Sequence, residues 1–166
     1  MKRQIKPRKV VWNPRIGPAA NARRQLPRLA SEFFGQVRSA LAANPTPDQL
    51  HQVRLAAKRI RYTLELFRPC YGPALEVRLD SLRELQQVLG EINDCAATGR
   101  LLAKSAGASP NRARAERFLA ARLREKTTDL RRRWAGGMGA PGQEVVWTQY
   151  LAIHARLPRT MPGSPD

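Results

Sequence analysis

The sequence predicts an all-α protein, an antiparallel bundle of four to five helices preceded by a basic N-terminal arm. Apolar residues recur at three- and four-residue steps over most of the chain, and no long alternating stretch indicates a strand. Helix start signals, each a capping residue followed by proline, stand at Thr46 and Ser109. With 166 residues the chain is long enough to bury a core of its own.

Composition divides the chain into three parts. Residues 1–20 contain six Lys and Arg residues, three prolines and no acidic residue, which predicts a flexible or loosely docked basic arm. Residues 21–135 carry the helical patterns and form the predicted bundle. Residues 136–166 begin with the linker-like GGMGAPG and continue as a short C-terminal helix or tail.

The clearest start signal in the bundle belongs to its second helix. Thr46 suits the N-cap, Pro47 suits the first helical position, and Gln49 completes a capping box. We therefore expect a helix over about residues 47–69. The first helix precedes it, and Pro27 predicts that this helix either begins or kinks there.

Glycines divide the rest of the predicted bundle. Gly72 separates the second helix from the third, and Gly90 is expected to interrupt the third. A shorter helix then follows over about residues 91–105. Ser109, with proline after it, opens a further helix that ends near Trp134.

The charge is the largest departure from an average protein. The chain has 30 Lys and Arg against 13 Asp and Glu, a net charge of +17, which creates a field that attracts anions. Nucleic acid, acidic membranes and inorganic polyphosphate are all candidate partners on this ground. No apolar run is long enough to span a membrane, so we expect no membrane association. The two cysteines lack metal-site spacing, and no secretory signal is visible, so a cytoplasmic location is expected.

The second helix carries a basic strip beside its apolar seam. Successive residues are turned by about 100° on a helix. One face then contains the apolar residues Leu50, Val53, Ala57, Ile60, Leu64 and Phe67. A second face contains His51, Arg54 and Lys58, with Arg61 between the two. Arg59 points to another side.

Like charges three or four residues apart destabilise an isolated helix by about 0.2–0.5 kcal/mol per pair. Glu65 can pair with only one of the basic residues in the strip. An external anion, or acidic groups of another helix, must therefore compensate the others. The alternative is an ordinary solvated surface that happens to be rich in arginine.

Two blocks of sequence resemble the CHAD family of α-helical domains. They are LHQVRLAAKRIRYTLELF at residues 50–67 and LRELQQVLGEIND at residues 82–94, and FLAARLREKTTDLRRRW is similar to the closing helix of the family. The resemblance covers residues 21–135. Domains of this family typically contain two related helical halves, whereas this chain has one HxxRxxxKRxRY block. The resemblance therefore implies either a half-module, for which a homodimer is the natural closed arrangement, or a chain that has lost the full groove.

The resemblance also implies a function, the non-catalytic binding of inorganic polyphosphate, with targeting to polyphosphate granules. The expected binding residues are His51, Arg54, Lys58, Arg59, Arg61, Arg83 and Arg122, the last two forming an opposite wall. The alternative is a basic protein associated with nucleic acid, which would contact backbone phosphates through its arm and its arginine-rich residues 110–134.

Signals for catalysis are weak in this sequence. No paired histidines at metal spacing, phosphate-binding loop or nucleophile motif is present, so neither a metal nor a cofactor is predicted. Glu91 and Asp94 lie three residues apart and are the one carboxylate pair considered. Pairing with basic neighbours explains these carboxylates better than catalysis does. We therefore predict that the protein is not an enzyme and rank a metal-dependent hydrolase last.

Overall fold

The fold is an all-α bundle, as predicted. A computed structural model describes residues 11–104 and 109–157, and within these ranges it contains helices and no strand. The elements in chain order are α1 (Pro18–Leu41), α2 (Pro47–Leu66), α3 (Arg68–Tyr71), the short 3-10 helix η1 (Pro73–Leu75), α4 (Glu76–Lys104), α5 (Pro110–Gly136) and α6 (Gln143–Ile153).

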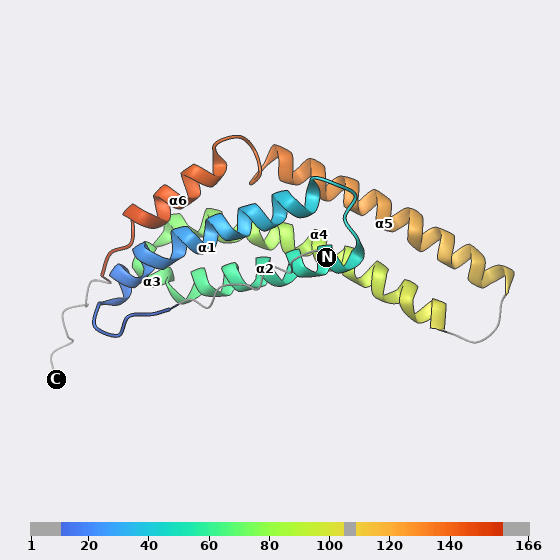
Figure 1. The fold of residues 1–166 in the computed structure, drawn as a ribbon, viewed down its shortest axis with the longest axis horizontal. Helices are drawn as coiled ribbons and strands as arrows, with labels where there is room; N and C mark the ends of the chain where they lie inside the picture. The colour runs from blue at the N-terminus through green and yellow to red at the C-terminus, as the bar shows by residue number, and fades with distance from the viewer. Residues whose placement is uncertain (1–10, 105–108, 158–166) are drawn as a thin grey trace, which may run out of the picture.

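Three long helices build the body of the bundle, and two further helices cover it. α2 packs against both α1 and α4, α6 lies on α1, and α5 lies on α4. The C-terminal half of α4 and the N-terminal half of α5 form a hairpin that extends beyond the ends of α1 and α2 (Figure 1). The long α4 therefore connects the body of the bundle with the hairpin.

The core confirms the predicted apolar seam of α2. Its members Leu50, Val53, Ala57, Ile60 and Leu64 are all at most 2% exposed. Phe67 follows the end of the helix, where its ring stacks on Trp12 at a centroid distance of 4.9 Å. Residues 11–17, from the end of the basic arm, are thus docked on the bundle. Residues 1–10 lie outside the described part of the chain.

The start of α2 is confirmed, and its end comes slightly earlier than predicted. The Thr46 hydroxyl accepts a hydrogen bond from the Gln49 backbone N–H, and the Gln49 side chain accepts one from the Thr46 N–H. The helix ends at Leu66, and Pro69, which has no N–H to donate to the Glu65 carbonyl, lies in the first turn of the next helix, α3. Pro27 lies inside α1, which already begins at Pro18.

The predicted interruption at Gly90 is wrong, because α4 is one continuous helix through this position. Glycine in a helix interior costs about 0.5–1 kcal/mol relative to alanine. Burial of an apolar side chain stabilises by about 1.5–3 kcal/mol. Leu89 and Ile92 are each 1% exposed, and Val88 is also buried, so packing on either side of the glycine outweighs its local penalty.

The C-terminal helix α6 packs on α1, a partner that the sequence did not reveal. Trp147 of α6 is buried, and its ring meets Phe34 of α1 edge to face at 5.6 Å. At the start of α6, Glu144 accepts hydrogen bonds from the Ser31 hydroxyl and from the Arg38 guanidinium. The segment after the GGMGAPG turn is therefore attached to the body of the bundle.

Candidate functional site

The basic strip lies along the seam between α2 and α4. Three contacts fix the register of these two helices. Nδ1 of His51 lies 3.0 Å from Oδ1 of Asn93, so that the ring N–H donates to the amide oxygen. The Gln86 amide donates to the Ala57 carbonyl at 2.8 Å, and its oxygen accepts from Nε of Arg61 at 3.0 Å. The two helices therefore run antiparallel, with His51 near one end of the seam and Arg61 near the other.

Arg54 and Lys58 occupy the middle of this strip. Both side chains are partly buried. Within residues 11–104 and 109–157, no carboxylate or other polar group forms an ion pair or hydrogen bond with either side chain. They stand about 6 Å apart, one helical turn, so each also experiences the charge of the other. The fold thus holds two neighbouring cations in place without neutralising them.

Internal carboxylates neutralise the other end of the strip. Oε1 of Glu65 lies 2.8 Å from Nη1 of Arg61 and 3.5 Å from Nη2 of Arg83. Arg83 also donates to Asp80 at 2.6 Å and lies 3.4 Å from Glu76, and the hydrogen bond to Asp80 raises the pKa of Arg83. Arg61 and Arg83 thus lie at this end of the strip, and each is already paired.

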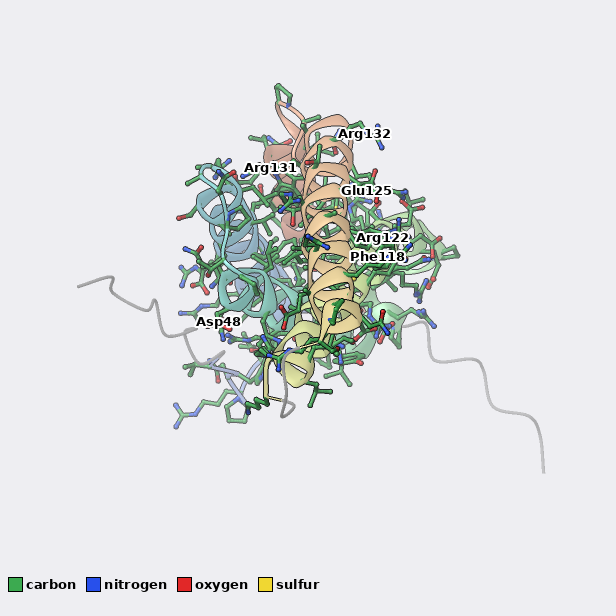
Figure 2. All side chains as sticks on the ribbon, turned by 90° about the vertical axis from the view of Figure 1, so that its right-hand side faces the viewer. Asp48, Phe118, Arg122, Glu125, Arg131 and Arg132 are labelled. Carbon is green, nitrogen blue, oxygen red and sulfur yellow. The ribbon has the colours of Figure 1, made fainter. Side chains whose placement is uncertain are left out.

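The structure does not bring Arg59 or Arg122 into the strip. Arg59 is turned by about 100° from Lys58 around the helix axis. Arg122 lies on α5, which packs on α4, and it donates to Glu125 at 3.0 Å (Figure 2). The opposite wall expected from Arg122 does not form, because α5 packs on a different side of α4 from α2.

The fold extends the strip onto two residues that the sequence analysis missed. Arg100 and Lys104 follow Asn93 by seven and eleven positions, which places both within about 20° of it on the surface of α4. Both are exposed, and neither has an ion pair or hydrogen bond with any residue that the structure describes. The spacing of Asn93, Arg100 and Lys104 can be read from the sequence. What the sequence lacked was the contact that joins Asn93 to His51.

One member of the carboxylate pair considered for catalysis is engaged in an ion pair with α5. Lys126 of α5 forms an ion pair with Glu91, and its hydrogen bond lowers the pKa of the Glu91 carboxyl. Asp94 is exposed. In the described ranges no three His, Cys, Asp or Glu side chains are grouped to hold a metal ion. None of the described helices is long and apolar enough to cross a membrane.

Comparison with known proteins identifies a family for most of the chain. The family model described as the CHAD domain matches residues 6–103, more than half of the sequence. No curated protein and no solved structure gives a significant match. The matched range contains α1, α2 and nearly all of α4, and therefore every contact described above between α2 and α4.

Proposed function

The chain belongs to the CHAD family, and on this premise we propose that it binds inorganic polyphosphate non-catalytically through the basic strip. One observation carries the proposal. Arg54 and Lys58 are partly buried, lie one turn apart and have no anionic partner in the described part of the chain. Partly buried like charges destabilise a fold unless an anion compensates them. A ligand that supplies several negative charges in a line satisfies both cations at once.

The shape of the strip favours a linear polyanion. From Lys58 to His51 along α2, and from Asn93 to Lys104 along α4, the strip extends over about 27 Å at 1.5 Å per residue. The carboxylates around Arg61 and Arg83 end the line on the other side. Polyphosphate consists of phosphates alone, so it needs neither base recognition nor stacking, and aromatic residues make up only 6% of the chain.

One observation favours the alternative ligand, nucleic acid. The helix α5 carries three exposed arginines whose guanidinium groups make no polar contact with any described residue, namely Arg114, Arg117 and Arg124. Such a surface can contact backbone phosphates without reading sequence. It lies on the hairpin, outside the strip, so the two ligands are distinguishable by experiment.

A competition titration decides between these ligands. Labelled RNA is bound to the protein at physiological salt and then titrated with long-chain polyphosphate, or with unlabelled RNA at equal phosphate concentration. We expect polyphosphate to displace the labelled RNA at a phosphate concentration at least about tenfold lower than unlabelled RNA does. This corresponds to a difference in binding free energy of about 1.4 kcal/mol. The proposal fails if RNA competes as well as polyphosphate does. Non-catalytic binding further requires that the polyphosphate is recovered at unchanged length, also with a divalent cation present.

We further propose that two copies associate and that the protein is held on polyphosphate granules in the cytoplasm. The single HxxRxxxKRxRY block supports the pairing, since the resemblance implies a domain of two such halves. The hairpin exposes large apolar side chains that a partner can cover, Leu101 at 70% and Phe118 at 68%. Location on granules follows if the strip retains the protein on their surface.

A further inference from the structure

Gly90 has no structural reason to be glycine. It lies in the interior of the continuous helix α4, and among the described residues only Gly72 and Gly142 adopt a positive φ. A Cβ added at Gly90 would meet no atom of another element within 4 Å, so close packing does not require its absence. The position nevertheless costs about 0.5–1 kcal/mol relative to alanine.

The position of Gly90 on α4 connects it with the basic strip. Gly90 lies four residues after Gln86 and three before Asn93, so all three share one face of the helix. Gln86 contacts α2 at Arg61 and Ala57, and Asn93 contacts it at His51. These contacts bracket the two unpaired cations of α2. Gly90 therefore lies on the face of α4 turned toward α2, opposite the stretch containing Arg54 and Lys58.

We propose that Gly90 forms a notch in the wall of the strip that admits an unsubstituted phosphate chain and excludes a sugar-phosphate backbone. This inference rests on the proposed function and assigns its specificity. Any side chain at this position would stand in the space above α4, beside Arg54 and Lys58, and would hold a ligand away from them. Electrostatic attraction falls with distance, and it falls further when water enters between the charges. A chain without sugars or bases fits closest.

The same helix provides a matched control. Gly99 follows Gly90 by nine positions, which turns it by about 180°, to the opposite side of α4. There it lines a cavity of about 470 Å³ between α4, α5 and the first residues of α2, and a Cβ added to it also meets nothing within 4 Å. The same substitution at either position thus changes the same helix, α4. Only the substitution at Gly90 lies at the strip.

The test measures the affinities of Gly90→Leu, Gly99→Leu and the unmodified protein for long-chain polyphosphate and for single-stranded RNA, at one salt concentration. We expect Gly90→Leu to weaken polyphosphate binding about tenfold and RNA binding about twofold or less, whereas Gly99→Leu changes both about twofold or less. Circular dichroism and thermal unfolding establish that the variants fold. Gly90→Ala is the milder second variant, and it should unfold at a higher temperature than the unmodified protein while binding polyphosphate less tightly.

Each other outcome contradicts the inference in a distinguishable way. If the unmodified protein prefers polyphosphate and Gly90→Leu binds it as Gly99→Leu does, the notch is refuted and the proposed function stands. If Gly90→Leu loses both ligands equally, Gly90 belongs to the site but does not select between them, and the inference is again refuted. If the unmodified protein shows no preference for polyphosphate, the proposed function fails and the inference fails with it.

Discussion

At the scale of single residues, the nearest carboxylate decides whether a cation of α2 can bind a ligand. Arg61 is held by Glu65 and Gln86, whereas Lys58 and Arg54, one and two turns earlier, have no such partner in the described part of the chain. The strip therefore contains both compensated and uncompensated cations. A ligand competes with Glu65 at one end of the strip and with no described carboxylate in its middle.

Removing the competing carboxylate should strengthen binding. We expect Glu65→Gln to raise the affinity for polyphosphate about three- to tenfold, because Arg61 and Arg83 lose a shared internal anion and one negative charge leaves the strip; this corresponds to about 0.6–1.4 kcal/mol. The control is Glu84→Gln on α4, which removes the same charge from an exposed residue without an ion-pair partner in the described ranges. Equal affinities of the two variants would mean that only net charge matters.

The sequence predicted part of this site for a definite reason. Helical phase alone groups His51, Arg54 and Lys58, since residues three and four apart share a face. Phase within one helix cannot show which residue of another helix lies opposite. The pairing of Arg83 with three carboxylates, and the continuation of the strip onto Arg100, depend on such contacts and were not predictable.

At the scale of elements, the sequence predicted helix boundaries correctly where a capping motif determines them. The Thr46 box forms as predicted because it needs only neighbouring residues. The helix interruption predicted at Gly90 was wrong because the neighbours of this glycine are buried against other helices. Local helix propensity contains no information about such burial. The packing of α6 on α1 depends on contacts between residues more than a hundred positions apart, which helical periodicity does not encode.

The attachment of α6 should depend on pH through Glu144. Its hydrogen bonds from Ser31 and then Arg38 lower the pKa of the Glu144 carboxyl in the folded state. Its contribution to stability is therefore present above the unfolded value of about 4.3 and is lost as pH falls through the lower folded value. Because the pair is partly exposed, we expect Glu144→Gln to lower the free energy of unfolding by about 0.5–1 kcal/mol at neutral pH and by little at about pH 3.

Urea unfolding at several pH values measures this difference. The matched control is Glu32→Gln on α1, a carboxylate without a hydrogen-bond or ion-pair partner in the described ranges, which should show no such pH-dependent difference. If the Glu144 variant lost the same stability at pH 3 as at pH 7, the ionised carboxylate would not be what attaches α6.

At the scale of the whole molecule, charge opposes self-association and a polyanion relieves it. Two copies together carry twice the net charge of +17, so their mutual repulsion weakens any contact through the exposed apolar residues of the hairpin. Bound polyphosphate neutralises part of this charge, and a long chain has free phosphates for a second copy. Ligand binding and pairing should therefore support each other.

The mass in solution tests this coupling. We expect light scattering at physiological salt to show a larger fraction of dimer with polyphosphate than without it, and Leu101→Lys with Phe118→Lys to reduce that fraction. Tripolyphosphate is the control, because it is too short to bridge two copies. A monomer at every ligand concentration would refute the proposed pairing without affecting the strip itself.

The most direct test of the basic strip compares two charge reversals of equal size. Arg54→Glu with Lys58→Glu changes the strip, and Arg24→Glu with Arg28→Glu changes two exposed cations of α1 at the same spacing, which also have no described partners. Polyphosphate affinity is measured over a range of salt concentrations. The strip variant should lose about tenfold or more in affinity, and the slope of its salt dependence should fall by about 1.5–2, as expected for two lost phosphate contacts, while the α1 variant changes by about twofold. Equal losses in the two variants would show that the protein attracts polyphosphate through its overall charge and has no binding strip.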